Sequence, residues 1–295
     1  MRSDSERTPP TILTLILLTG IATLSLNMFV PSLVNIADEF EVDYALASVS
    51  IAGYLAVTAV VMIIVGPLSD RYGRRPVILV GTLLFTLASV GCLLAENIWV
   101  FLVCRFLQAA VVAGGSLPRV IARDMLPPKE AAVMLGYISM AMAIAPMLGP
   151  MLGGVLDEYF GWRASFLAFT LFGAILLALS WADLGETNKD MSATFREQVQ
   201  GYPQVLQSGV FWGYSICMSF SVGAFYAFIA GVPLVANVVF DVSTSRLGIY
   251  MGSITCGFFI GSFIAARITK HIRMISMVIA GRVLACAGLG VGIEI

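Results

Sequence analysis

The sequence predicts an all-α integral membrane protein built as a bundle of about nine spanning helices. Composition favours this class, because 59% of the 295 residues are hydrophobic, only 12% are charged and mean hydropathy is +0.92. Apolar stretches of about 20 residues, the length that crosses a hydrocarbon core of ~30 Å, recur along the chain. A compact charged turn at residues 66–76 separates two of them. Its three arginines are too costly to face lipid, so the turn must lie at a membrane surface.

The apolar stretches fall into a group of six, a polar break and a group of three. The predicted helices are residues 12–34, 46–67, 77–95, 98–119, 131–156, 163–183, 209–238, 247–266 and 274–293. The break at 185–208 contains several charged residues and is interpreted as a cytoplasmic linker. We therefore expect an N-terminal six-helix half at 1–184 and a partial C-terminal half of about three helices at 209–295.

The distribution of Lys and Arg predicts that the N terminus is cytoplasmic. Thirteen of the 17 basic residues fall in connections on the side of the N terminus, whereas only Arg163 and Arg246 fall on the other side. The remaining two, Arg105 and Arg282, lie within spans. Net charge is −1, so the chain has no basic surface for nucleic acid and we expect no such partner.

Residues 66–75, GPLSDRYGRR, resemble the G-x-L-(S/A)-D-R-x-G-R-R motif between helices 2 and 3 of the major facilitator superfamily. Gly66 permits close approach of a helix, and Asp70 can accept hydrogen bonds from donors or from a helix N terminus. The turn is thus interpreted as a latch for one conformation; the alternative is a basic anchor alone. The predicted conformational gate comprises Gly66, Asp70, Arg71, Gly73, Arg74, Arg75 and Asp124.

Arg105 and Gln108 form an R-x-x-Q sequence that is similar to a motif of proton-coupled members of this superfamily. An arginine at membrane depth costs about 3 kcal/mol on insertion scales, so we expect Arg105 to face a wet or polar interior. The alternative is that its side chain extends toward the outer interface. Gln108 lies one turn away on the same helix face and could bind cargo or Arg105.

The fifth predicted helix carries a glycine–proline sequence that resembles the motif of antiporters in this superfamily. Its residues are Pro146, Gly149, Pro150, Gly153 and Gly154. Glycines four residues apart allow close helix packing, and the prolines bend the helix. Residues 27–31, 119–124 and 223–233 resemble the bicyclomycin and chloramphenicol resistance (Bcr/CflA) branch, and residues 161–166 are similar to a sequence of many drug:proton antiporters.

The resemblance implies a central substrate site between helices. Inward-facing aromatic and polar side chains of the helices near 12–34, 46–67, 98–119, 131–156 and 209–238 are the candidates, because aromatic groups with a few polar ones suit amphiphilic cargo. The predicted substrate-binding residues are Asn27, Phe29, Tyr54, Arg105, Gln108, Tyr137, Phe225, Tyr226 and Phe228. Packing or lipid contact is the alternative role for each aromatic residue.

Two features depart from the family pattern. Many relatives carry an aspartate in the first helix where this chain has Asn27, and an asparagine cannot carry a proton. The family usually has two six-helix halves, whereas this sequence reaches Ile295 within or just after the ninth predicted helix. Residues near Gly261–Arg273 resemble a degraded second copy of the charged turn, so part of a second half is present. We therefore expect a truncated gene product or fragment.

The expected function is secondary active export of drug-like or amphiphilic small molecules in exchange for protons, by alternating access, as in antibiotic resistance. A proton gradient would drive this export. We expect no metal, because the five cysteines lack metal-ligand spacing, and no cofactor, because the chain has no phosphate-loop or hydrolase motif. We do not expect the protein to be an enzyme. We expect a monomer in the bacterial inner membrane, and its expected partners are the small-molecule substrate and membrane lipid. The alternatives are a sugar or amino-acid efflux carrier of the same fold and a truncated fragment that does not transport.

Overall fold

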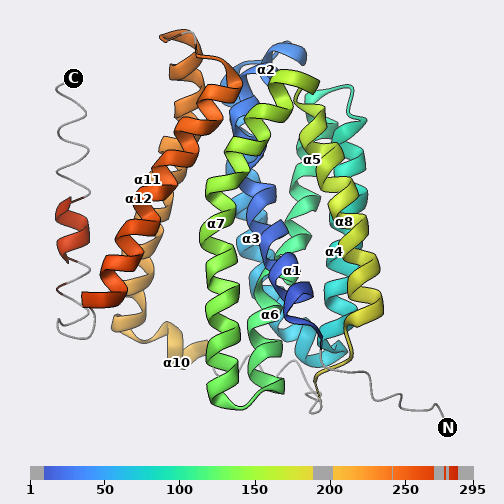
Figure 1. The fold of residues 1–295 in the computed structure, drawn as a ribbon, viewed down its shortest axis with the longest axis vertical. Helices are drawn as coiled ribbons and strands as arrows, with labels where there is room; N and C mark the ends of the chain where they lie inside the picture. The colour runs from blue at the N-terminus through green and yellow to red at the C-terminus, as the bar shows by residue number, and fades with distance from the viewer. Residues whose placement is uncertain (1–9, 189–201, 241, 269–275, 277–278, 285–295) are drawn as a thin grey trace. The chain divides into compact units, whose positions relative to one another are not determined.

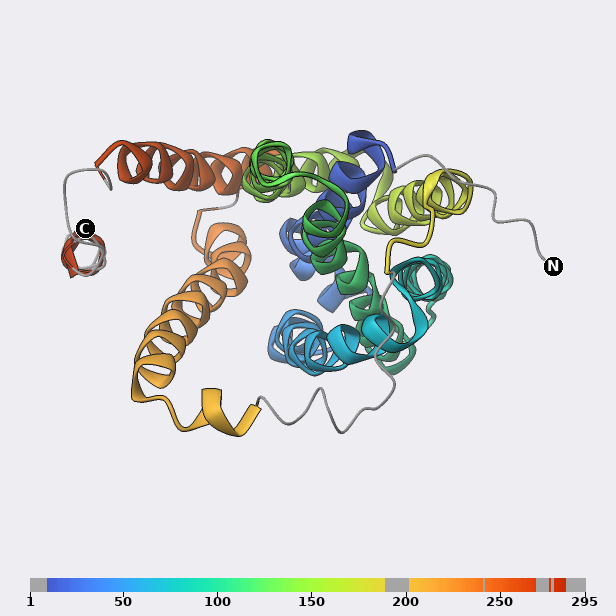
Figure 2. The same ribbon diagram turned by 90° about the horizontal axis from the view of Figure 1, so that it is seen from below.

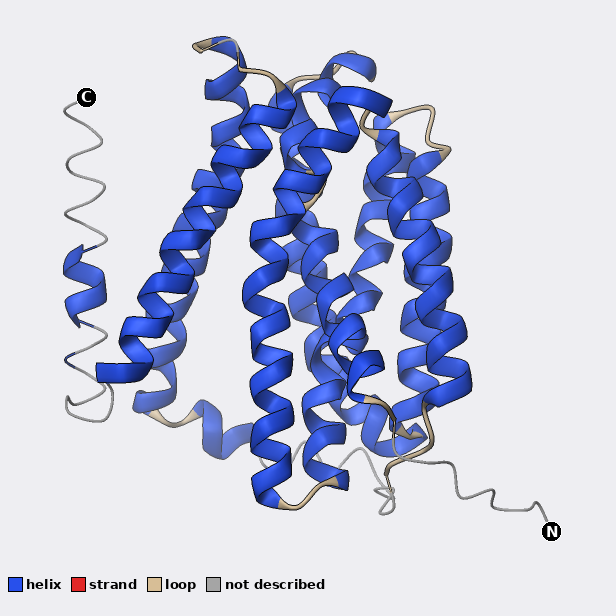
Figure 3. Cartoon of the chain, in the orientation of Figure 1, coloured by secondary structure: helices blue, strands red, loops and turns tan. Residues whose placement is uncertain are grey.

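The computed structural model describes residues 10–188, 202–240, 242–268, 276 and 279–284. Every regular element in these ranges is helical (Figure 3). The helices are α1 (Ile12–Asn27), η1 (Val30–Ser32), α2 (Leu33–Glu39), α3 (Tyr44–Tyr72), α4 (Arg74–Leu93), α5 (Ile98–Gln108), η2 (Ala109–Val111), α6 (Val112–Met125), α7 (Pro128–Phe160), α8 (Arg163–Asp183), α10 (Tyr202–Leu206), α11 (Gly209–Val238) and α12 (Thr244–Ile268), where η marks a 3-10 helix.

Seven helical segments in the described part of the chain are long and apolar enough to cross a membrane. They confirm the seven helices that the sequence predicts between residues 12 and 238. Two of them are composite: Ile12–Glu39 joins α1, η1 and α2, and Ile98–Met125 joins α5, η2 and α6. α12 covers the eighth predicted helix, and most of the ninth, 274–293, lies outside the described residues.

Short polar residues and glycines set the helix ends. Thr11 caps α1 and Asn97 caps α5, where the Asn97 Oδ1 accepts a hydrogen bond from the Val100 amide at 3.0 Å. Gly73 and Gly161 separate consecutive helices with φ of 96° and 78°, a region that glycine adopts without a Cβ penalty. Such sharp ends allow neighbouring helices to pack antiparallel.

α1 and α4 each pack against several other helices of the bundle. α1 contacts α6, α7 and α8, while α4 contacts α3, α5, α6 and α8 (Figures 1 and 2). One buried apolar cluster includes Phe29, Tyr54, Phe101 and Phe166, and a second lies around Leu18, Ile78 and Ile121. The two clusters hold the six segments between Ile12 and Asp183 together.

The contacts between residues divide the chain into two compact units. The first unit is Met1–Gly252, and the second is Ser253–Ile295. The first unit contains α1–α11 and the start of α12. Within it, α11 packs on α2, η1 and α3, and the Tyr44 hydroxyl donates to the Ala230 carbonyl. The second unit holds the remainder of α12 and helical residues 276 and 279–284. The predicted boundaries at 184 and 208 stay predictions.

Candidate functional site

Arg105 lies fully buried inside the bundle, near the end of α5. Its Nη1 donates to the Gln108 Oε1, and the Gln108 Nε2 donates to the Ser89 Oγ of α4 at 2.6 Å. The Ser89 hydroxyl in turn donates to the Phe85 carbonyl at 2.7 Å. The side chain is therefore directed into the protein, where a hydrogen-bonded chain connects it to α4, and not toward the outer interface.

Three aromatic rings surround the Arg105 guanidinium. Its Cζ lies 4.1 Å from the ring centroid of Phe29, 4.7 Å from that of Tyr54 and 5.9 Å from that of Phe166. These distances allow cation–π attraction, which strengthens when the cation is desolvated. We call Arg105, Gln108, Phe29, Tyr54 and Phe166 the Arg105 cluster. Its residues come from four spans, so the cluster depends on the folded bundle.

The Arg105 cluster lies where two spans lose regular helical structure. α1 ends at Asn27, and Phe29 precedes the 3-10 helix Val30–Ser32; α5 ends at Gln108, directly before the 3-10 helix Ala109–Val111. A 3-10 turn within a helix often marks a hinge, and interrupted helices line substrate sites in several transporter folds. Two interruptions next to one buried charge distinguish this region from the rest of the described bundle.

The structure places the other predicted substrate-binding residues in different environments. Asn27 is buried, and its Nδ2 donates to the Thr23 carbonyl at 2.8 Å. Tyr226 of α11 packs against the same apolar core as Tyr54 and interacts with Asn27. The other three predicted residues are exposed and do not belong to the Arg105 cluster: Tyr137, Phe225 and Phe228.

The charged turn forms a network at one end of the bundle, which we call the basic end. Arg74 is 8% exposed and pairs through Nη1 with the Asp70 carboxylate. Its Nε lies 3.4 Å from the Asp124 Oδ2, and its Nη1 also donates to the Ser69 Oγ at 2.7 Å. The network joins α3, α4 and α6. Arg71 is exposed over the Tyr72 ring.

One gate contact expected from the sequence is not seen. A Cβ added at Gly66 would meet nothing within 4 Å among the described residues, so no helix approaches closely there. The tight position in the turn is Gly73, where a Cβ would lie 2.2 Å from the Glu186 Oε2. The group that closely approaches the turn is therefore the Glu186 side chain, which follows α8 in the sequence.

Glu186 is the main residue of this network that sequence reasoning missed. Its carboxylate accepts hydrogen bonds from the Arg74 amide at 2.9 Å and the Arg75 amide at 3.3 Å, so it caps the N terminus of α4. The Asn188 Nδ2 donates to the Asp70 carbonyl at 2.9 Å. The only sequence signal was an acid just after a span, which does not reveal a partner more than 100 positions away.

The glycine–proline sequence of α7 packs on two sides. Gly149 and Gly153 face the end of α1, where a Cβ on Gly153 would lie 1.5 Å from the Met28 carbonyl oxygen. On another side, a Cβ on Gly154 would lie 2.4 Å from the Thr244 carbonyl oxygen. Pro146 and Pro150 lie inside the helix. Small residues therefore allow α7 to contact α1 and the start of α12 at once.

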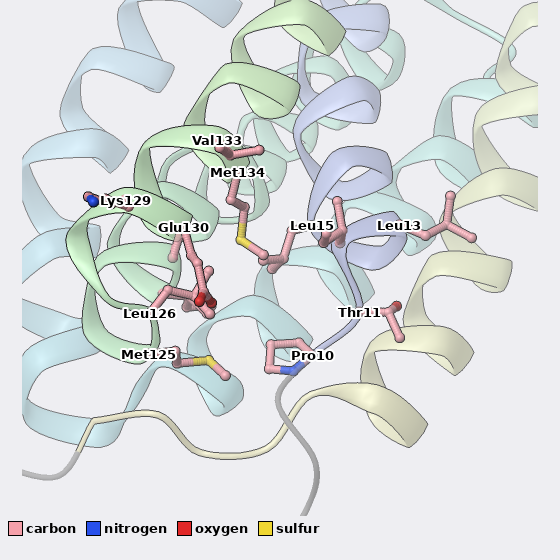
Figure 4. A pocket seen from close by; sticks show the side chains of 13 residues that line it. Pro10, Thr11, Leu13, Leu15, Met125, Leu126, Lys129, Glu130, Val133 and Met134 are labelled. Atoms are coloured by element: carbon pink, nitrogen blue, oxygen red, sulfur yellow. The ribbon is translucent and has the colours of Figure 1, made fainter.

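A pocket of about 820 Å³ opens at the basic end (Figure 4), and no residue of the Arg105 cluster lines it. It lies between the start of α1, the end of α6 and the start of α7, and its lining is largely apolar. The side chains that line it include Pro10, Leu15, Met125, Lys129, Glu130 and Met134. None of the predicted site residues lines this pocket.

Comparison with known proteins agrees with this helical architecture. The family model described as Major Facilitator Superfamily matches residues 15–293. The chain is 30% identical over 253 residues to the uncharacterized MFS-type transporter YdgK of Bacillus subtilis, covering 84% of this chain and 63% of the relative. It is 32% identical over 217 residues to a chloramphenicol resistance protein of Pseudomonas aeruginosa, covering 72% and 51%.

Solved structures show the same fold. A bacterial homolog of the human lysosomal transporter Spinster, in an inward-facing and occupied conformation, matches 89% of this chain and 61% of its own with a TM-score of 0.72 and 19% identity. A D-xylose-proton symporter matches 88% and 69% with a TM-score of 0.65 and 14% identity. The chain spans less than two thirds of the length of the Bacillus and Pseudomonas relatives. The extent of the family match, from residue 15 to residue 293, shows that this integral membrane protein belongs to the Major Facilitator Superfamily.

Proposed function

We propose that the protein is a secondary active transporter that exports drug-like or amphiphilic small molecules in exchange for protons. The observation that carries this proposal is the Arg105 cluster, a fully buried cation among aromatic rings beside two helix interruptions. A buried charge in a membrane bundle is costly and is usually retained for function. Relatives that include a chloramphenicol resistance protein and a multidrug resistance protein, MdtM of Salmonella typhimurium, favour drug-like cargo.

The proposed mechanism is alternating access around the Arg105 cluster. Cargo binds between aromatic rings, and the hinges at η1 and η2 let the ends of α1 and α5 adjust to it. The network of Asp70, Arg74 and Asp124 is proposed to act as the conformational gate, because it joins three helices at the basic end. The glycine–proline sequence of α7 supports antiport by its resemblance to the antiporter motif.

A proton gradient is the proposed energy source, with no cofactor. Asn27 cannot carry the proton, and the acids of the described spans lie near helix ends. The coupling group is therefore proposed to lie outside the Arg105 cluster. We also propose that the protein is a monomer in the bacterial inner membrane. Its basic end is proposed to face the cytoplasm, because Lys and Arg are in excess at that end.

Uptake of radiolabelled chloramphenicol into everted membrane vesicles tests the proposal, because uptake in this orientation corresponds to export. The chain should drive uptake that depends on an imposed pH gradient and collapses with an uncoupler. Arg105→Ala should abolish it, whereas Arg123→Ala, which changes an exposed arginine of α6, should leave it largely intact. No gradient-driven uptake of chloramphenicol by correctly inserted protein would contradict the proposal. Uptake of a labelled sugar or amino acid instead would favour the metabolite carrier.

A further inference from the structure

We infer that the Arg105 cluster selects amphiphiles whose polar group is a carboxylate, over otherwise equal molecules that carry an ammonium group. This inference rests on the proposed function, whose substrate class it narrows. The buried guanidinium of Arg105 has three nitrogens. Nη1 donates to Gln108, whereas Nε and Nη2 find no hydrogen-bond acceptor among the residues that the structure describes.

The two unpartnered nitrogens form one edge of the guanidinium plane. The N–H groups of Nε and Nη2 point in parallel along this edge, which is the arrangement that two oxygens of one carboxylate match. Gln108 occupies the opposite nitrogen and holds the plane in place through its bond to Ser89. The edge that remains is therefore preorganised for a planar anion and needs no change in the Gln108 contact.

Among the residues that the structure describes, no acid forms an ion pair with Arg105. The acids that the structure describes in the spans lie near helix ends, and most of them have other partners. Glu39 pairs with Arg163, and Asp70 and Asp124 pair with Arg74. Asp157 accepts a hydrogen bond from Asn35, and Asp183 accepts from Thr11 and Thr14. A buried ion without a counter-ion is costly, so a bound anion would stabilise this site and a bound cation would add a second positive charge.

The rings define the other half of the expected ligand. Phe29, Tyr54 and Phe166 flank the guanidinium within 6 Å, so an apolar or aromatic body can pack against them while its carboxylate reaches the free edge. Phe29 lies in the two-residue gap between α1 and η1, where no regular helix holds it. The Phe29 ring is fully buried, so it has to move before a ligand can reach the guanidinium.

Three ligands with one aromatic body separate the charge of the head group from hydrophobicity. 1-Naphthaleneacetate, 1-naphthaleneacetamide and 2-(1-naphthyl)ethylammonium would be titrated by equilibrium dialysis into the purified chain in nanodiscs of zwitterionic lipid, with empty nanodiscs subtracted. The carboxylate should bind at least about tenfold more tightly than the ammonium, because a carboxylate accepts charge-assisted hydrogen bonds from the guanidinium, whereas an ammonium offers no acceptor and carries the same charge. The amide should lie between them.

Arginine variants assign the preference to a residue. Arg105→Gln should remove the preference for the carboxylate, and Arg105→Lys, which keeps the charge but lacks the parallel edge, should reduce it. Arg123→Gln is the matched control, since this arginine of the adjoining helix α6 is exposed, and it should leave the preference unchanged. Size-exclusion chromatography and circular dichroism check that each variant is folded; the comparison of ligands on the unaltered chain needs no variant.

The outcomes separate this inference from the proposed function. Equal binding of the three ligands, or tighter binding of the ammonium, overturns the selection for anions even where chloramphenicol uptake is intact. A carboxylate preference that survives Arg105→Gln overturns the assignment to Arg105. Failure of all three to bind a chain that transports chloramphenicol overturns the inference alone. A carboxylate preference without any gradient-driven uptake supports the binding site and contradicts the transport function.

Discussion

Gly153 of α7 lies directly against the backbone of Met28, at the point where α1 ends. A Cβ built on Gly153 would stand 1.5 Å from the Met28 carbonyl oxygen, which is far too short for two non-bonded atoms, so the backbone would have to move. Met28 immediately precedes Phe29, the ring nearest to the Arg105 guanidinium. The packing of α7 therefore helps to position the Arg105 cluster.

Replacement of Gly153 by alanine is expected to destabilise the bundle. The new methyl group must push α7 away from α1, and overpacking of this kind typically costs about 1–3 kcal/mol. The free energy of unfolding, measured by titration with sodium dodecyl sulfate in mixed micelles, should fall by that amount. Gly136→Ala is the control, since it lies in the same helix with nothing within 4 Å of the added Cβ. Equal stability of the two variants would contradict this account of the contact.

The spans themselves could be predicted from the sequence, because their apolar length is fixed by the thickness of the bilayer. Hydropathy does not report helix interruptions, so the 3-10 segments η1 and η2 were not foreseen. The first and fourth helices also extend beyond their predicted ends, to Glu39 and Met125. Their last turns carry charged residues that a search for apolar stretches leaves out.

The candidate site was predictable only in part. Arg105 and Gln108 are three positions apart on one helix, so their contact follows from local geometry. That Phe166 joins Phe29 around Arg105 depends on how distant helices pack, which a single sequence does not reveal. Glu186 was missed for the same reason. Individual aromatic residues such as Tyr137 and Phe228 could not be assigned to the interior, because membrane helices carry aromatic residues on every face.

Removal of the Glu186 carboxylate should loosen the N terminus of α4. In Glu186→Ala the Arg74 and Arg75 amides lose their acceptor, and loss of such a cap costs about 0.5–2 kcal/mol. Hydrogen–deuterium exchange measured by mass spectrometry should accelerate in the peptide that covers residues 73–77. Glu130→Ala, which removes an exposed acid from the first turn of α7, should leave that peptide unchanged. Unaltered exchange in Glu186→Ala would show that the carboxylate does not cap α4.

Glu39 is expected to stabilise the end of the bundle opposite the basic end. Its carboxylate accepts hydrogen bonds from the Trp162 Nε1 at 2.5 Å and from Arg163. The Arg163 side chain also donates to the carbonyls of Leu93 and Ala95. Glu39→Gln should therefore lower the thermal unfolding midpoint in detergent, and the neighbouring Asp38→Asn serves as the control.

Salt should reveal how much of the Glu39 effect is ionic. The Glu39 and Arg163 side chains are 43% and 36% exposed, so screening by solvent keeps the contribution of the ion pair below about 1 kcal/mol. The difference between the unaltered chain and Glu39→Gln should shrink at about 1 M salt, where the screening length falls to ~3 Å. A difference that is independent of salt would assign the effect to the hydrogen bond that the Glu39 carboxylate accepts from the Trp162 Nε1.

Tyr54 should support Arg105 through its ring more than through its hydroxyl. The ring centroid lies 4.7 Å from the guanidinium, whereas the hydroxyl shares a hydrogen bond of 2.8 Å with the Ser25 Oγ. Tyr54→Phe keeps the ring, and the Ser25 hydroxyl still donates to the Ala22 carbonyl, so carboxylate binding should change by less than about threefold. Tyr54→Leu removes a ring that packs against the guanidinium and against the aromatic body of the ligand. Loss of the ring contact with the ligand, worth about 1.5 kcal/mol, should weaken binding about tenfold. Equilibrium dialysis of 1-naphthaleneacetate measures both, and equal losses in the two variants would assign the role of Tyr54 to its hydroxyl instead.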